Sequence, residues 1–76
     1  MKKKFTSFPK MWIFINGNIY VLKSPLTIQE LLEWLNFDHT PLIIEYNQKI
    51  LSKTTLNSIF LQNLDRLELI TIVGGG

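Results

Sequence analysis

The sequence predicts a small α+β domain, in which a mixed sheet of four or five strands packs against one main helix. Three features predict it: a strand pair joined by Asn16-Gly17, a single amphipathic helix that begins near Thr27, and an apolar last strand that leads into three glycines. A chain of 76 residues is long enough for one such domain and too short for two. We expect residues 1–10, which lack periodicity, to form a flexible extension, and residues 11–76 to form the domain with its glycine tail.

The opening hairpin has the clearest signal. Residues 11–15 and 18–22 are rich in aromatic and β-branched side chains, which favour strands. Asn16-Gly17 lies between them, and the type I′ turn of a tight hairpin requires the positive φ angles that Asn and Gly adopt most readily. The sequence therefore predicts two antiparallel strands joined by a two-residue turn.

The start of translation stays open. Both Met1 and Met11 could be the first residue of the protein.

One helix of about ten residues is predicted next. Thr27 and Glu30 match a capping box, in which the Thr27 hydroxyl accepts from the Glu30 amide and the Glu30 carboxylate accepts from the Thr27 amide. An apolar stripe follows at the spacing of one helix face, formed by Ile28, Leu31, Leu32 and Leu35. Asn36, Asp38 and Pro41 predict the end of the helix.

The second half of the chain alternates short apolar runs with polar turns. Strands are predicted over residues 42–46, 50–51 and 67–73, with a single helical turn over residues 56–60. Four aromatic side chains are expected to pack in or against the core rather than to bind a ligand: Trp12, Phe14, Trp34 and Phe60.

Side chains of the last strand alternate between two faces of the sheet. If Leu67 and Leu69 meet the helix, Ile70 and Ile72 face outward beside the tail. Exposed apolar side chains bordered by polar ones can mark a protein interface, so Ile70, Ile72 and Val73 are candidate partner-binding residues. The alternative, that Ile70 and Ile72 only cover a second face of the sheet, stays open.

The chain offers little of the chemistry that enzymes use. It has no cysteine, which excludes a disulfide, a thiolate metal site and a cysteine nucleophile. His39 beside Asp38 is a weak catalytic candidate, because catalysis also needs a nucleophile close in space. Asp65 beside Arg66 is better explained as a pair that stabilises a turn. We expect no catalytic residue and no bound metal.

Charge and hydropathy disfavour two further classes of protein, nucleic-acid-binding proteins and membrane proteins. The formal net charge is +2, and much of the excess lies in residues 2–4, so the rest of the chain is nearly neutral and a nucleic-acid partner is not expected. No segment has the ~20 apolar residues that span a bilayer, and no apolar signal core follows the N-terminal lysines. We therefore expect a cytoplasmic protein. The abundant Ile, Asn and Lys are typical of an AT-rich genome, such as that of a plastid or of an AT-rich bacterium, and a plastid-encoded protein would be located in the stroma.

The terminal Gly74-Gly75-Gly76 is the unusual feature. Without side chains, the three residues can extend about 10 Å and enter a narrow channel, where they would present the carboxylate of Gly76. A carboxylate is a poor electrophile, but it becomes reactive once a partner that holds ATP converts it to an acyl-adenylate. The plain alternative is a frayed terminus.

These features together resemble the ThiS family of sulfur carriers of thiamin biosynthesis. The resemblance covers roughly residues 11–76, and residues 1–10 depart from it because family members tend to begin at the first strand. Four motifs in order carry it: Ile15-Asn16-Gly17, Thr-Ile-Gln-Glu-Leu-Leu at 27–32, Ile-Glu-Tyr-Asn-Gln-Lys-Ile at 44–50, and Asp-Arg-Leu-Glu-Leu at 65–69 with Val73-Gly74-Gly75-Gly76.

The resemblance implies a β-grasp (ubiquitin-like) fold and a reaction cycle at Gly76. A ThiF-type adenylating enzyme would use ATP and magnesium to join AMP to the Gly76 carboxylate. A persulfide donor would then supply sulfur to form a thiocarboxylate, which a ThiG-type thiazole synthase would consume. Gly74 and Gly75 would thread into the partner enzymes, and the carrier itself would bind no cofactor.

Three other functions stay open. The same fold and a Gly-Gly end occur in the small subunit of molybdopterin synthase. A ubiquitin-like modifier would instead use the tail to form an isopeptide bond with a lysine. The third is an interaction domain whose glycine end has no chemical role.

Overall fold

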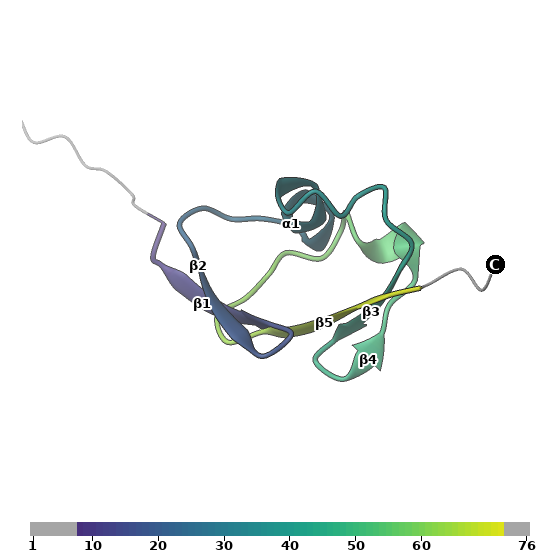
Figure 1. Ribbon diagram of the computed structural model, residues 1–76. Helices are drawn as coiled ribbons and strands as arrows, with labels where there is room; N and C mark the ends of the chain where they lie inside the picture. The colour runs from purple at the N-terminus through teal and green to yellow at the C-terminus, as the bar shows by residue number, and fades with distance from the viewer. Residues whose placement is uncertain (1–7, 73–76) are drawn as a thin grey trace, which may run out of the picture.

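The computed structural model describes residues 8–72 and confirms that a sheet packs against one helix. The elements in chain order are β1 (Met11–Ile15), β2 (Asn18–Leu22), α1 (Ile28–Trp34), β3 (Leu42–Tyr46), β4 (Lys49–Ile50), the 3₁₀ helix η1 (Lys53–Thr55) and β5 (Arg66–Thr71). Five strands form a single sheet, and α1 covers one of its faces (Figure 1). The first residues of the predicted extension and the glycine tail lie outside the described residues.

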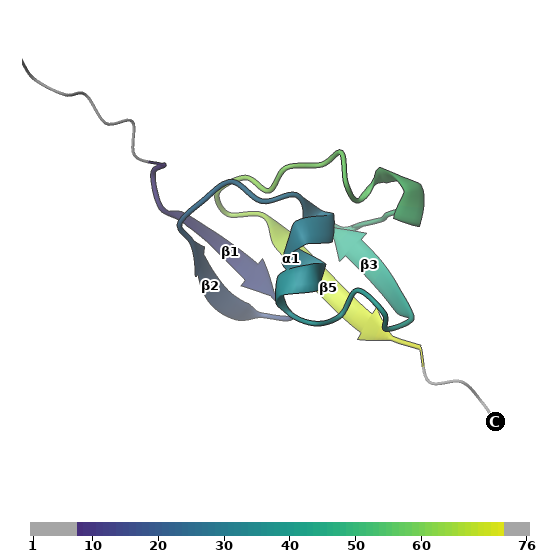
Figure 2. The ribbon, with the colours of Figure 1, turned by 90° about the horizontal axis from the view of Figure 1, so that it is seen from above.

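The last strand of the chain lies in the middle of the sheet. The strand order is β2-β1-β5-β3-β4, and β5 pairs parallel with β1 and antiparallel with β3. Viewed from above, α1 crosses over β5, and the start of β1 and the end of β5 lie at opposite ends of the domain (Figure 2). The sheet is therefore mixed, as the sequence predicts.

Two tight turns shape the hairpins. Asn16 and Gly17 have φ angles of 49° and 83°, which confirms the predicted type I′ turn between β1 and β2. Asn47 and Gln48, with φ angles of 49° and 74°, form a second turn with positive φ at both positions. Because that turn ends at Gln48, Lys49 already pairs with Tyr46, and β4 begins one residue before the predicted strand.

The start of α1 matches the prediction, and its end comes early. The Glu30 amide donates to the Thr27 hydroxyl at 3.1 Å, and the Thr27 amide donates to the Glu30 carboxylate at 2.9 Å, so the capping box is present. The helix has seven residues rather than ten, because Asn36 turns the backbone left-handed at φ 64°. The Phe37 amide then donates to the Leu32 carbonyl at 2.8 Å and closes the helix end.

The predicted helical turn over residues 56–60 is wrong in position. It lies earlier, at Lys53–Thr55, where the Ser52 hydroxyl accepts from the Thr54 amide at 3.2 Å and caps the turn. The segment after it bonds to the chain around the start of α1, through Gln29 to Leu56, Ile28 to Ile59 and Leu61 to Leu26. These backbone bonds fix the position of α1 above the sheet.

The core lies between α1 and the sheet. Its buried apolar side chains are Ile13, Ile15, Leu22, Ile28, Leu31, Leu32, Leu42, Ile44, Leu56, Leu61, Leu67 and Leu69. The expected core packing of the aromatic residues is wrong for Trp12, Trp34 and Phe60, which are exposed. In β1, Ile13 and Ile15 take the core positions, so alternation places Trp12 on the outer face of the sheet.

Candidate functional site

The candidate site is the end of β5, from which the chain continues into the glycine tail. Val73 and the three tail glycines, Gly74, Gly75 and Gly76, lie outside the described residues, so the site is described up to Ile72. Thr71 pairs with Leu42, the first residue of β3, and the Ile72 amide donates to the Pro41 carbonyl at 3.1 Å. The tail therefore follows a strand that is held by β3 up to its last residues.

The outer face at this end of β5 is apolar and exposed. Leu67 and Leu69 are buried beneath α1, so the predicted assignment of faces is confirmed, and Ile70 and Ile72 point outward with exposed fractions of 45% and 50%. Ile43 lies opposite Ile70 on β3. We call Ile43, Ile70 and Ile72 the β5-end patch. Among residues 8–72, no second layer covers it.

An acidic pair borders this patch. Glu45 on β3 lies directly opposite Glu68 on β5, a pairing that the scattered carboxylates of the sequence did not reveal. Like charges at directly opposite positions are unfavourable in a sheet. Within residues 8–72 the close contact between an acidic and a basic side chain is the surface pair Asp38–His39, at 3.3 Å, so neither glutamate has a salt-bridge partner among the described residues. An apolar patch with an acidic border suits a partner surface that combines apolar and basic side chains.

Asp65 anchors the opposite end of β5. It is buried, and its carboxylate accepts from the Tyr46 hydroxyl at 2.7 Å, the Gln62 amide at 2.7 Å and the Asn47 side chain at 3.1 Å. The expected pairing of Asp65 with Arg66 is wrong, because the Arg66 guanidinium lies 4.4 Å from the centre of the Phe14 ring instead. The carboxylate stabilises the turn before β5 without Arg66.

Comparison with known proteins identifies the family. The sequence model of the ThiS family matches residues 13–76, which include α1, most of β1 and all four of the remaining strands. The chain belongs to the ThiS family. Members of this family are small β-grasp sulfur carriers of thiamin biosynthesis, and the predicted fold class is confirmed.

Individual relatives of this ThiS-family chain agree. A protein named ycf40 from Trieres chinensis is 38% identical over 63 residues, which are 83% of this chain and 86% of that protein. A thiazole synthase of Magnetococcus marinus is 30% identical over 66 residues, 87% of this chain but 20% of that enzyme. The crystal structure of ThiS from Geobacter metallireducens has the same fold, with a TM-score of 0.75 and 23% identity over 87% of this chain and all of that one.

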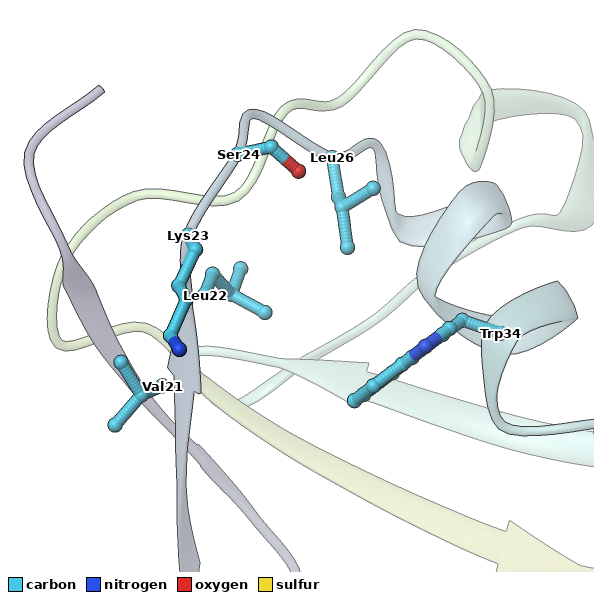
Figure 3. Close-up of a pocket in the computed structure, with 6 residues that line it drawn as sticks. All are labelled: Val21, Leu22, Lys23, Ser24, Leu26 and Trp34. Carbon is cyan, nitrogen blue, oxygen red and sulfur yellow. The ribbon is translucent and has the colours of Figure 1, made fainter. Parts of the chain in front are cut away.

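The ThiS-family domain also has a hollow of about 400 Å³ between β2 and α1 (Figure 3). Leu22, Leu26 and Trp34 point into it from β2, the following connection and α1. Leu22 pairs with Met11 at the start of β1, and β1 runs parallel to β5, so the hollow lies at the end of the sheet where β5 begins. It is remote from the end of β5 that leads to the tail.

The described part of the chain contains little that could act as a catalytic or metal site. No group of three or more His, Asp or Glu side chains in residues 8–72 is arranged to hold a metal ion. His39, the weak catalytic candidate, has an almost fully exposed side chain, and its Nε2 lies 3.3 Å from the Asp38 carboxylate. No helix in this part of the chain is long and apolar enough to cross a membrane.

Tyr46 reports on the anchor at the start of β5. Burial, and after it the hydrogen bond to Asp65 and the charge of that carboxylate, together raise the pKa of the Tyr46 hydroxyl to about 12. An unfolded tyrosine ionises near its ordinary pKa of 10.0. The folded state therefore retains the Tyr46 proton in a range of pH in which the unfolded chain loses it.

We predict that the free energy of unfolding falls as the pH rises from about 10 towards about 12, and that Tyr46→Phe removes part of this fall. The contribution of Tyr46 is complete below pH 10.0 and is lost as the pH passes about 12. Urea denaturation at a series of pH values measures it. Tyr20→Phe, which removes a hydroxyl from β2 that does not bond to Asp65, should keep the alkaline fall of the wild type. Equal slopes for wild type and Tyr46→Phe would refute the assignment.

Proposed function

We propose that this chain carries sulfur on the carboxylate of Gly76 for synthesis of the thiazole moiety of thiamin. The observation that supports the proposal most directly is the position of the tail: three glycines follow a strand in the middle of a ThiS-family sheet. The strand supplies a fixed base, and the glycines supply a segment without side chains. Such a protein serves as a co-substrate of other enzymes rather than as a catalyst.

The chemistry requires three steps, of which the first activates the Gly76 carboxylate. A carboxylate oxygen of Gly76 attacks the α-phosphorus of ATP, which releases pyrophosphate and leaves an acyl-adenylate. A persulfide sulfur then attacks the carbonyl and displaces AMP, and a thiol reduces the resulting S–S bond to release the thiocarboxylate. An E1-like adenylating enzyme of the ThiF type would bind the ATP and magnesium, so the carrier itself needs no cofactor site.

The receiving partner is proposed to be a thiazole synthase of the ThiG type. The thiazole synthase of Magnetococcus marinus, of which a fifth resembles this chain, supports the choice. A carrier-like segment within such an enzyme is expected if the two proteins act on the same sulfur atom. This relative also favours the thiamin pathway over the molybdopterin pathway and over ubiquitin-like conjugation.

The partners are proposed to dock on the outer face beside the tail. Ile70 and Ile72 expose apolar surface there, and Val73 is the next residue along the chain. A contact at this place would hold the domain while the glycines enter the partner's site. The reaction would take place in the cytoplasm or the plastid stroma, where reduced sulfur species persist.

Removal of Gly76 should abolish sulfur loading and leave the fold intact. Incubation with ATP, an adenylating enzyme and a persulfide donor, followed by intact-protein mass spectrometry, should show replacement of one oxygen by sulfur in the full chain and no such product in the truncated one. Removal of residues 1–7, which precede the segment matched by the family model, is the control and should load normally. Thiazole formation supported by the truncated chain would disprove the proposal.

The docking proposal predicts that Ile70→Arg raises the KM of the carrier in the adenylation reaction by about tenfold or more, because an exposed apolar contact is lost and a charge is buried. Ile19→Arg is the matched control, since Ile19 is also exposed on the outer face but lies on β2, two strands away from β5. It should change KM by less than about twofold. Equal effects of the two substitutions would argue against docking at the β5-end patch.

A further inference from the structure

Asn16 makes a contact across the sheet that its place in the hairpin turn does not require. Its side-chain oxygen accepts from the Leu69 amide at 2.7 Å, and its side-chain nitrogen donates to the Leu69 carbonyl at 3.2 Å. Both bonds reach a strand that is 53 residues away in the sequence. The orientation of the amide is fixed, because the Leu69 N–H needs an acceptor and the Leu69 carbonyl needs a donor.

This contact continues the pairing of β1 beyond its last residue. The amides of Phe14 and Asn16 donate to the carbonyls of Asp65 and Leu67, both at 2.9 Å. The chain then turns back at Gly17, so no further backbone of β1 is available to β5. The planar side-chain amide of Asn16 takes the place of the next peptide group. Among residues 8–72, it is the group that pairs with the β1-facing edge of β5 beyond Leu67.

Asn47 is a natural comparison within the same sheet. It also begins a two-residue turn with a φ angle of 49°, and its side chain also bonds to β5. Its oxygen accepts from the Arg66 amide at 2.9 Å, and its nitrogen donates to the Asp65 carboxylate at 3.1 Å. Asn47 therefore holds the start of β5, whereas Asn16 holds the half of the strand from which the chain continues to Gly76.

We infer that Asn16 is a positioning residue for the carrier reaction. Its two hydrogen bonds clamp β5 at Leu69 and so fix the direction in which the chain leaves the domain towards Gly76. The inference rests on the proposed function. Without the clamp, residues 69–72 would be paired on the β3 side alone, by the Ile70–Ile43 and Thr71–Leu42 pairs and the bond to Pro41. A strand paired on one edge frays more readily than one paired on both.

Fraying at this place would weaken the binding of the tail by the partners. An enzyme that takes Gly76 into its active site must hold the preceding residues in one conformation, and the conformational entropy lost by each residue that becomes ordered opposes binding. A domain that already holds Leu69 in place before binding lowers this entropic cost. Loss of the Asn16 bonds should therefore raise the KM of the carrier, with little change in kcat.

Asn16→Gly is the most direct variant. Glycine adopts the φ angle of 49° without strain, so the turn is retained while both bonds to Leu69 are lost. Asn47→Gly is the matched control, because it makes the same change at the same φ angle and removes two bonds to the start of β5. Asn16→Asp is a second variant, which keeps the acceptor for the Leu69 amide and loses the donor to its carbonyl.

The first readout needs no partner enzyme. Hydrogen exchange followed by NMR should show the Leu69 amide exchanging about tenfold faster in Asn16→Gly than in Asn47→Gly, at conditions where both are folded by circular dichroism. Unchanged exchange at Leu69 in Asn16→Gly would overturn the clamp itself. This outcome would leave the sulfur-carrier function untouched.

The second readout is the kinetics of sulfur loading with the adenylating enzyme, measured by intact-protein mass spectrometry. We expect the KM of Asn16→Gly to rise about tenfold with kcat nearly constant, Asn16→Asp to fall between, and Asn47→Gly to stay within about twofold of wild type. If the wild type loads and the two glycine variants have equal KM values, the positioning role is disproved. If the wild type never loads, the proposed function fails instead. Should Asn16→Gly not fold, the comparison of Asn16→Asp with wild type decides.

Discussion

The parallel pairing of β1 with β5 is the interaction on which the rest of the structure depends. It brings the first and last strands of the domain together and places the last strand in the middle of the sheet. A central strand is held on both edges, and its inward side chains, Leu67 and Leu69, lie in the core. The C-terminal residues of the chain therefore follow a strand that has a neighbouring strand on each side. A chain of 76 residues buries only a small core, so pairing with two neighbouring strands contributes to holding this strand in place.

Polar side chains secure the two ends of β5, and each does so differently. At its start, the buried Asp65 carboxylate gathers donors from Tyr46, Asn47 and the Gln62 amide. At its end, Asn16 supplies a single amide that substitutes for missing backbone. The outer face beside that end remains apolar and uncovered in the described residues. A fixed strand, an open apolar face and a tail without side chains are the combination that a carrier for other enzymes needs.

The sequence predicts the features that depend on near neighbours. The Asn16-Gly17 turn, the Thr27–Glu30 capping box and the alternation along β5 all involve residues within a few positions of each other. It does not predict the contacts that the sheet creates between distant segments, such as Tyr46 with Asp65 at a separation of 19 residues and Asn16 with Leu69 at 53. Pairing of β3 with β5 likewise decides that Glu45 faces Glu68. Trp12 is exposed because Ile13 and Ile15 occupy the core positions of β1, and alternation along the strand places Trp12 on the opposite face.

The central claim is that the carbonyl of Gly76 carries sulfur in the living cell. The most direct measurement is tandem mass spectrometry of the protein isolated from its own cells and cut with trypsin after Arg66, which releases residues 67–76 as one peptide. We expect part of this peptide to contain sulfur in place of one oxygen at its C-terminus, and we expect the sulfur-bearing fraction to rise when thiazole synthesis is blocked. A peptide found with an unmodified carboxylate in every molecule, or joined to a lysine of another protein, would contradict it.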